Sequence, residues 1–341
     1  MRFGPVPVGE AAGLITAHTI TAGGTTLRKG RIIPPETVAR LEAEGVRDLV
    51  TVSLEPGDVG EDEAAERLAR RLMGAGLRAE PPFTGRCNLF AEHAGVLLVG
   101  RAAIDAVNDV DEAITAATLP AFRPVVAGEM VATVKIIPYA VAGATLARAC
   151  AAAPEAALGV APYRRLRVGV VSTRLPSLKE RTIDGTLRIL AERLAPAGAR
   201  IVAERRVAHD AQAVAGALAA VIDEGRADLA IVFGASAIAD RRDVIPAGIE
   251  AADGSVRHLG MPVDPGNLLL LGDRGGVPVI GAPGCARSPK ENGFDWMLHR
   301  LLADLTVKRA DIVALGVGGL LMEIVSRPQP RAGGASVGLD D

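Results

Sequence analysis

Aromatic residues are scarce in this chain, and its net charge is close to zero. Only 3% of the 341 residues are aromatic, and 38 basic residues stand against 40 acidic ones, which gives a net charge of −2. Nucleic-acid-binding proteins generally stack bases on aromatic side chains or carry a clear excess of positive charge. The composition therefore argues against nucleic acid as a partner.

Cysteine, histidine and long apolar runs are also in short supply. Cys87, Cys150 and Cys285 show no CxxC spacing, which argues against a disulfide framework and against a zinc site. The five histidines stand singly, without the spacing of metal ligands. We expect no signal peptide at the N-terminus and no membrane span in the apolar stretch 312–324, which is too short. A cytoplasmic protein without a membrane partner is therefore expected.

What the chain does have is a globular composition and an alternation of strands and helices over residues 165–302. Hydrophobic residues make up 49% and charged residues 23%, which suits two or three domains with full cores. Strands are predicted at 166–173, 199–204, 227–233, 268–271 and 278–281, and helices at 183–194, 212–223, near 243–249 and from 292 onward. This order is typical of an α/β domain with a mostly parallel sheet.

Three loops in this half are built from small residues. Gly234-Ala235-Ser236 directly follows the strand 227–233, and the loops 264–267 and 281–288 each contain a Pro-Gly pair. Small residues let backbone N–H groups approach a phosphate. In an open α/β sheet, ligands bind beyond the carboxyl ends of the strands. The layout therefore predicts a site for a small molecule that carries phosphate.

The first half, residues 1–160, is predicted to be an α+β region with possible subdomains at 1–55 and 56–160. A hairpin turn is expected at 22–24, and a helix begins at Pro34-Pro35. Further helices are predicted at 61–73, 104–117 and 141–153, with a helix-like segment after the loop 85–88. Residues 153–162 are expected to be a linker into the second domain, 165–325, and residues 326–341 a flexible tail or linker.

Six short motifs follow one another along residues 165–305. They are Val170-Val-Ser-Thr173, Ile183-Asp-Gly-Thr186, Val207-Ala-His-Asp210, Gly234-Ala-Ser236, Pro265-Gly266 and Pro283-Gly284. This half resembles the molybdopterin-binding domain of molybdenum-cofactor biosynthesis proteins, the family of molybdopterin adenylyltransferase and molybdopterin molybdotransferase. The first half is similar to the N-terminal region of the molybdotransferase branch, and to the front portion of fused proteins that end in a molybdenum-cofactor cytidylyltransferase domain.

The resemblance implies a three-layer α/β domain that binds molybdopterin or the molybdenum cofactor, with Mg²⁺ and a nucleotide as further candidates. It also implies a homo-oligomer, either a dimer or a trimer. The candidate cofactor-binding residues are Ser172, Thr173, Asp184, Gly234, Ala235, Ser236, Pro265, Gly266, Asn267, Pro283, Gly284, Arg287 and Lys290. Asp240 and Asp243 are the candidate catalytic residues and Mg²⁺ ligands.

Most of these side chains also have a plain structural alternative. Helix capping is the alternative for Ser236, Asp184, Asp240 and Asp243, and solvation at the surface is the alternative for Arg287 and Lys290. Asp210, which precedes the helix 212–223, is expected to cap that helix rather than bind a ligand. Cys285 lies in a candidate loop, but no histidine is placed to activate its thiol.

The chain departs from the family pattern at four places. The turn 174–177 is Arg-Leu-Pro-Ser where the family has Gly-Asp-Glu-Leu, and Phe233, Asn267 and Cys285 replace a glycine, a lysine and an asparagine. Transfer of a nucleotide or of molybdate needs cations and carboxylates around phosphates. Three functions therefore stay open: a cofactor-binding protein that runs such a transfer, a non-catalytic carrier or scaffold for a cytidylyltransferase or molybdoenzyme, and a nucleotide pyrophosphatase related to competence-damage proteins.

Overall fold

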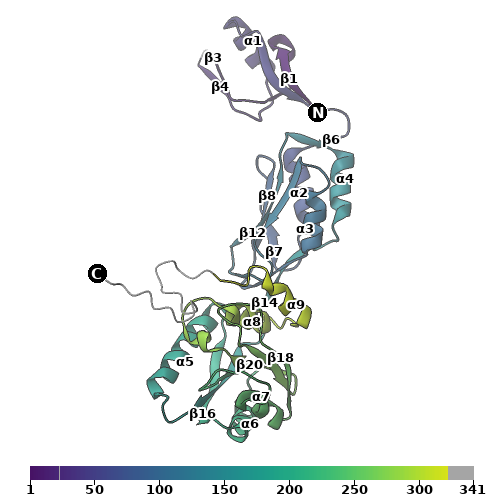
Figure 1. Cartoon of the computed structure of the whole chain (residues 1–341). Helices are drawn as coiled ribbons and strands as arrows, with labels where there is room; N and C mark the ends of the chain where they lie inside the picture. Colours follow the sequence, from purple (N-terminus) through teal and green to yellow (C-terminus); the bar gives the residue numbers. More distant parts are fainter. Residues whose placement is uncertain (23, 322–341) are drawn as a thin grey trace, which may run out of the picture. The chain divides into compact units, whose positions relative to one another are not determined.

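The computed structural model describes residues 1–22 and 24–321, and the chain divides into two compact units, residues 1–162 and a second that begins at Tyr163 (Figure 1). The tail expected at 326–341 lies outside the described residues. Within the described part, no helix is long and apolar enough to cross a lipid bilayer. Each unit has its own hydrophobic clusters.

The first unit starts with a small β-rich body that carries one helix. Its elements are β1 (Arg2–Pro7), β2 (Ile15–Thr16), β3 (Ile20–Ala22), β4 (Thr25–Leu27), α1 (Pro35–Ala43) and β5 (Asp48–Ser53). β1, β5 and β2 form an antiparallel sheet, and β3 pairs with β4 as the predicted hairpin. α1 begins behind Pro34, because proline suits the first turn of a helix. Its Leu41 packs with Val8 and Ile33.

The rest of the first unit has three helices and several short sheets. Its elements are β6 (Asp58–Gly60), α2 (Glu61–Leu72), β7 (Leu77–Ala79), β8 (Arg86–Ala91), β9 (Gly95–Val99), α3 (Arg101–Asn108), β10 (Ile114–Thr118), β11 (Pro124–Val125), β12 (Met130–Ile136), β13 (Ala140–Ala142), α4 (Gly143–Ala152) and β14 (Leu158–Pro162). The sheet order is β10-β12-β8-β7 in one sheet and β11-β9-β14 in another. α2 buries Ala64, Leu68 and Leu72 at the predicted four-residue spacing.

Three predictions for this unit are wrong. Strand β8 takes the place of most of the predicted loop 85–88 and of the helix-like segment after it, and its positions alternate between buried and less buried as in a strand. The predicted helix 104–117 ends at Asn108, and after a turn at 109–113 the chain continues as strand β10. The Asn108 side chain bonds both the N–H and the carbonyl of Ala116, at 2.7 and 2.9 Å, and so holds the new strand in place. Residues 158–162 pair with β9 as β14 and are not a linker.

The second unit is an α/β fold around one mostly parallel sheet. Its elements are β15 (Arg167–Arg174), α5 (Glu180–Leu194), β16 (Arg200–Ala208), α6 (Ala211–Ala219), β17 (Leu229–Phe233), α7 (Val244–Ala251), β18 (Gly254–Leu259), β19 (Leu270–Arg274), β20 (Val277–Ala282), α8 (Gly293–Leu302) and α9 (Arg309–Val313). The six strands have the order β16-β15-β17-β20-β19-β18. The first four run parallel, β19 runs antiparallel beside β20, and β18 pairs antiparallel with β19, so β18 again has the direction of the first four.

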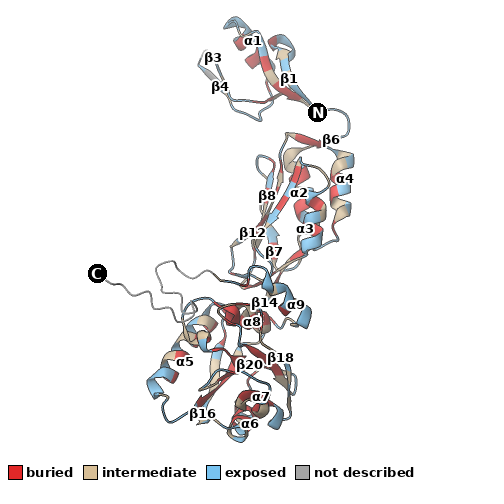
Figure 2. Ribbon diagram, viewed as in Figure 1, coloured by how far each residue is buried: buried red, intermediate tan, exposed pale blue. Residues whose placement is uncertain are grey.

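Both faces of this sheet are buried under helices (Figure 2). One apolar cluster joins strand residues to Leu190 of α5 and Phe294 of α8, and the other joins them to Leu218 of α6 and Ile249 of α7. All five residues of β17 are buried, which explains its unbroken apolar run. The fold therefore has three layers, and the carboxyl ends of four parallel strands meet at one edge.

A half-buried histidine of this unit makes its stability depend on pH. The His299 Nδ1 lies 2.8 Å from the Tyr163 hydroxyl. Burial lowers the pKa of His299 from its ordinary value of 6.5, outweighing the carboxylates of Asp295 and Glu291. Burial also raises the pKa of Tyr163 to about 12, so the phenol stays protonated. The folded unit therefore favours a neutral imidazole.

We predict that the free energy of unfolding falls as the pH drops below the ordinary pKa of histidine. The unfolded chain binds the proton more readily than the folded chain, so stability from this group is present above about pH 6.5 and is lost as the pH falls through the folded-state pKa. Urea unfolding of wild type and His299→Asn at a series of pH values measures this. The variant keeps an acceptor and does not titrate, so an equally steep decline in both proteins would contradict the prediction.

Candidate functional site

Polar residues gather at the edge where β15, β16, β17 and β20 end. Thr173, near the end of β15, is fully buried, and its Oγ1 accepts a hydrogen bond of 2.8 Å from the Ala235 N–H. The same oxygen lies 2.8 Å from the His209 Nδ1. Thr173 therefore ties together the end of β15, the residue after β16 and the loop after β17.

His209 extends this contact to the loop surface. Its Nε2 lies 2.9 Å from the hydroxyl oxygen of Ser236, which is exposed. In a neutral imidazole one nitrogen donates and the other accepts. The tautomer that accepts from Thr173 therefore donates to Ser236 and leaves the Ser236 hydroxyl proton free to point outward. Thr173, His209 and Ser236 thus form one chain of hydrogen bonds from the sheet to the surface.

Arg287 is the cation of this edge. It ends a short 3-10 turn (Gly284–Arg287) that follows β20, and its Nη1 donates to the Thr186 hydroxyl oxygen at 2.8 Å. Its Nη2 donates to the Gly234 carbonyl at 2.9 Å, and the guanidinium stands 5.4 Å from the centre of the Phe233 ring. Burial lowers the pKa of Arg287. In residues 1–22 and 24–321 no carboxylate forms an ion pair with it.

Ser172 adds an unsatisfied group close by in the sheet. Its side chain is 1% exposed, and its hydroxyl oxygen has no hydrogen-bond partner in the described part of the chain. Ser172 pairs in register with Phe233, the residue that carries Arg287 over its ring. A buried hydroxyl left without a partner costs about 1–3 kcal/mol. As far as the structure describes the chain, this edge therefore holds both a cation without a counter-ion and a buried hydroxyl without an acceptor.

We name Ser172, Thr173, Thr186, His209, the loop Gly234–Ser236 and Arg287 the carboxyl-edge cluster. Three of its features, Thr186, His209 and the bonding role of the Gly234 carbonyl, were not expected from the sequence. His209 in particular does not stand alone, as its lack of histidine neighbours suggested, but bridges two hydroxyl groups. In the structure it lies directly after β16, at the carboxyl edge of the parallel strands.

The second Pro-Gly loop carries Arg287, but among the described residues no hydrogen bond joins its Pro283 and Gly284, or Lys290, to the cluster. Pro283 follows β20, and its carbonyl accepts from the Ala286 N–H at 3.0 Å, which starts the turn from Gly284. The Lys290 side chain is exposed, and its carbonyl accepts from Arg193 at 3.1 Å. Pro283 and Gly284 therefore position Arg287, whereas the Lys290 ammonium lies at the surface.

The loop of Pro265, Gly266 and Asn267 packs on the start of α8. The Pro265 carbonyl accepts from the Gly293 N–H at 2.9 Å. Gly266 has φ 133°, and a Cβ at this position would stand 2.7 Å from the Gly293 Cα. The close approach explains why glycine is needed here. Asn267 is exposed, and its carbonyl accepts from the Met261 N–H at 2.9 Å, so the backbone of this loop bonds to its own surroundings and not to the carboxyl-edge cluster.

Asp184 lies inside α5 rather than at its start, and it bonds to an arginine. Arg206 donates from Nη2 to the Asp184 carboxylate at 2.8 Å and from Nη1 to Glu180 at 2.5 Å. Hydrogen bonds from Arg206 and Arg174 hold the pKa of Glu180 below its usual value. Asp184 is thus part of an ion-pair network at the neighbouring surface, and no pattern in the sequence indicated its partner.

Asp240 and Asp243 are both engaged by their own loop. Asp243 is the N-cap of α7, and its two carboxylate oxygens accept from the Val244 N–H at 2.8 Å and the Ala239 N–H at 3.1 Å. Arg242 donates to Asp240 from its side chain at 2.7 Å and its backbone at 2.9 Å, which lowers the pKa of Asp240. Among the described residues, no three His, Cys, Asp or Glu side chains gather as a metal site. Asp210 caps α6 as expected.

We predict that Asp243→Ala lowers the free energy of unfolding by about 1 kcal/mol, because it removes a helix N-cap. Asp240→Ala is the matched control, since this exposed carboxylate bonds Arg242 within its own loop, and its change should stay within about 0.5 kcal/mol. Urea unfolding followed by circular dichroism measures both. If Asp243→Ala were as stable as wild type but lost a stabilisation by Mg²⁺ that the wild type shows, the metal role would replace the capping role.

The structure thus has two units, and in its α/β domain the ends of the parallel strands carry the carboxyl-edge cluster with a half-buried arginine. A family model for the domain of unknown function DUF8806 matches residues 5–53. No curated protein matches the chain.

Among solved structures, the chain is similar to a molybdopterin biosynthesis MoeA protein from Pyrococcus horikosii, with 14% identity over 89% of this chain and 75% of that chain and a TM-score of 0.31. It is also similar to the molybdopterin biosynthesis enzyme MoaB from Thermus thermophilus, with 18% identity over 42% of this chain and 99% of that chain and a TM-score of 0.27.

Proposed function

We propose that the chain binds molybdopterin through its phosphate at the carboxyl-edge cluster and acts in molybdenum-cofactor biosynthesis. The observation that carries the proposal is Arg287, a half-buried guanidinium without a carboxylate partner among the described residues. A desolvated charge is costly unless an opposite charge compensates it. The planar guanidinium group of arginine binds phosphate, like carboxylate, through two parallel hydrogen bonds.

The groups around Arg287 suit a phosphate monoester. Ser236 offers an exposed hydroxyl whose proton His209 can direct outward, and the backbone of Gly234 and Ala235 lies at the strand end. The buried hydroxyl of Ser172, unsatisfied within the described residues, is a further donor in the sheet. Arg287 and Ser236 would hold the phosphate, and Ser172 would meet the ligand at the sheet. The site lies at the end of the strands where ligands bind in open α/β sheets.

A second candidate is a carrier or scaffold that binds the cofactor without transforming it, in partnership with a cytidylyltransferase or a molybdoenzyme. The observation that favours it is the state of the carboxylates: Asp243 caps α7, and Asp240 and Asp184 pair with Arg242 and Arg206. Binding of Mg²⁺ by Asp240 and Asp243 would have to compete with these bonds. The same engagement weighs against a pyrophosphatase, which also needs carboxylates to hold a metal.

Titration of the full chain with molybdopterin and with its AMP form tests these proposals. Calorimetry measures binding with and without Mg²⁺ and molybdate, and chromatography detects any product. Saturable binding with turnover supports a transferase, and saturable binding without turnover supports the carrier. Hydrolysis of ADP-ribose without binding of either pterin would instead indicate the pyrophosphatase. Absence of saturable binding to both pterins overturns the proposed function.

A further inference from the structure

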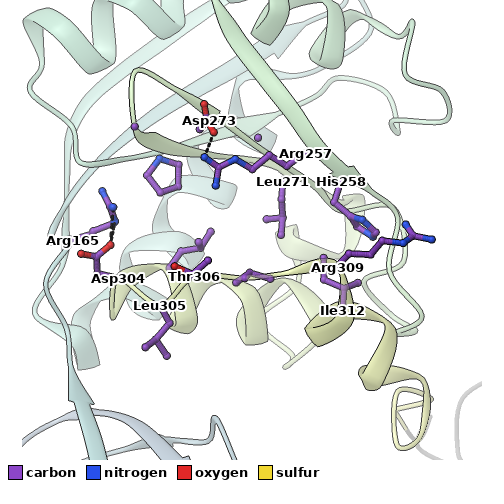
Figure 3. A pocket seen from close by; sticks show the side chains of 15 residues that line it. Arg165, Arg257, His258, Leu271, Asp273, Asp304, Leu305, Thr306, Arg309 and Ile312 are labelled. Carbon is purple, nitrogen blue, oxygen red and sulfur yellow. Dashed lines mark hydrogen bonds and ion pairs between the residues drawn. The ribbon is translucent and has the colours of Figure 1, made fainter.

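A pocket of about 260 Å³ opens in another part of the second unit, and it shares no residue with the carboxyl-edge cluster (Figure 3). It lies beside β18, β19 and β20, where α8 ends and α9 begins. Leu271, Pro278 and Ile312 are apolar residues of its lining. We call it the edge-strand pocket, because β18 is the last strand of the sheet.

A β-bulge turns two consecutive side chains of β18 into this pocket. The pairing of β18 with β19 shifts register between Val256 and His258, so Arg257 is an extra residue in the ladder. Successive residues of a regular strand point to opposite faces, but Arg257 and His258 both line the pocket. Bulges are frequent at sheet edges next to functional sites, where they redirect a side chain. The irregularity therefore has a local consequence: it adds a cationic group to the pocket.

Two arginines of the pocket are held by the two aspartates of its lining. Arg165 donates to the Asp304 carboxylate at 2.7 and 3.1 Å and to the Asp228 carbonyl at 3.0 Å. Arg257 forms an ion pair with Asp273 on the neighbouring strand. Figure 3 shows these pairs at separate parts of the rim. Both carboxylates of the lining are therefore occupied by arginines that they hold in place.

The remaining polar side chains of the lining have no partner among the described residues. Arg309, His258 and Thr306 make no side-chain hydrogen bond or ion pair with any residue in those ranges. Figure 3 places Arg309 and His258 together at the end of the pocket away from Arg165. Three arginines against two aspartates leave an excess of one positive charge. Within the part of the chain that the structure describes, the pocket thus combines apolar lining residues, one cation without a carboxylate partner and two polar side chains that are free to bind.

We propose that the edge-strand pocket binds a small organic anion with a flat apolar body, which rests on Leu271, Pro278 and Ile312 while its anionic group meets Arg309 and His258. The volume admits roughly ten non-hydrogen atoms, because a water molecule takes up about 30 Å³. Arginine binds carboxylate and phosphate in the same forked geometry, so both head groups share this chemistry. This site does not depend on the proposed function of the carboxyl edge.

The test is ligand-observed fluorine NMR on the full chain with 4-fluorobenzoate, 4-fluorophenyl phosphate and the neutral 4-fluorobenzyl alcohol. We expect saturable binding of both anions and roughly tenfold weaker binding of the alcohol, because it lacks the charge-assisted bond. Inorganic phosphate, which has no apolar body, should displace neither anion. Equal binding of the alcohol, or displacement by inorganic phosphate at equal concentration, would overturn the proposal.

Two variants test whether the ligand binds in this pocket. Arg309→Ala should weaken anion binding roughly tenfold, and Thr306→Phe should abolish binding by filling the space with an exposed substitution that leaves the core intact. Arg188→Ala is the matched control, since Arg188 is an exposed arginine on α5 outside the pocket, and it should bind like wild type. Unchanged binding in both Arg309→Ala and Thr306→Phe would show that the anion sits elsewhere.

Discussion

Replacing Arg287 with alanine is expected to weaken molybdopterin binding by roughly tenfold to a hundredfold, because a hydrogen bond between charged groups contributes about 1.5–3 kcal/mol. Arg287 is the cation of the carboxyl-edge cluster that lacks a carboxylate partner among the described residues, so its loss removes the charge that the phosphate would neutralise. Arg287→Lys keeps the charge but loses the fork, and its affinity should fall between the two. Isothermal calorimetry on the full chain measures all three.

Two comparisons make this result specific. Arg188→Ala removes an exposed arginine from the neighbouring helix α5, so it changes the net charge equally and should leave the affinity unchanged. Ser236→Ala removes the exposed hydroxyl next to His209 and should cost less than the arginine, about 0.5–1.5 kcal/mol. If Arg287→Ala bound molybdopterin as tightly as wild type does, the phosphate would not bind at this edge.

The place of the candidate site follows from the sequence, because strand ends are visible in it. Apolar runs predict β15 and β17 to within two residues, and Ser172, Thr173 and Gly234 lie where those runs stop. In a parallel sheet the carboxyl ends meet at one edge, so three loops far apart in sequence are expected together. The structure does bring Thr173, Ala235, Ser236 and Arg287 within one hydrogen-bonded group through His209, Gly234 and Thr186.

The partners inside that group are the part that the sequence does not reveal. His209 lies 36 residues from Thr173 and 27 from Ser236. The predicted second strand ends at residue 204, whereas β16 continues to Ala208. The prediction stopped early because Arg205 and Arg206 interrupt the apolar pattern of this half-exposed edge strand. His209 therefore looked like a loop residue instead of the residue after a strand. β18 was missed for the same reason, since its sequence Gly-Ser-Val-Arg-His-Leu is short and polar.

Removing Arg193 is expected to destabilise the second unit strongly. Its side chain and that of Asp295 are only 9% and 12% exposed, and the Arg193 Nε donates to the Asp295 carboxylate at 2.5 Å. It also donates to the Ala286 carbonyl at 2.8 Å and the Ser288 carbonyl at 2.6 Å. Arg193→Ala leaves a buried carboxylate without its partner, which costs about 3–5 kcal/mol. Urea unfolding measures the loss, with Arg188→Ala on the same helix as the control.

The double variant Arg193→Met/Asp295→Asn distinguishes the contribution of the ion pair to stability from that of the hydrogen bonds to the loop carbonyls. It removes both charges, and asparagine keeps an oxygen for the Asn292 N–H that Asp295 accepts at 2.8 Å. If the lone buried charge causes the loss, the double variant should recover most of the roughly 3–5 kcal/mol that Arg193→Ala alone costs. The Ala286 and Ser288 carbonyls would still lack their donor, so Arg287 between them would be held less firmly, and the double variant should bind molybdopterin more weakly than wild type does. A double variant as unstable as Arg193→Ala would show instead that the bonds to the loop carbonyls hold this part of the fold together.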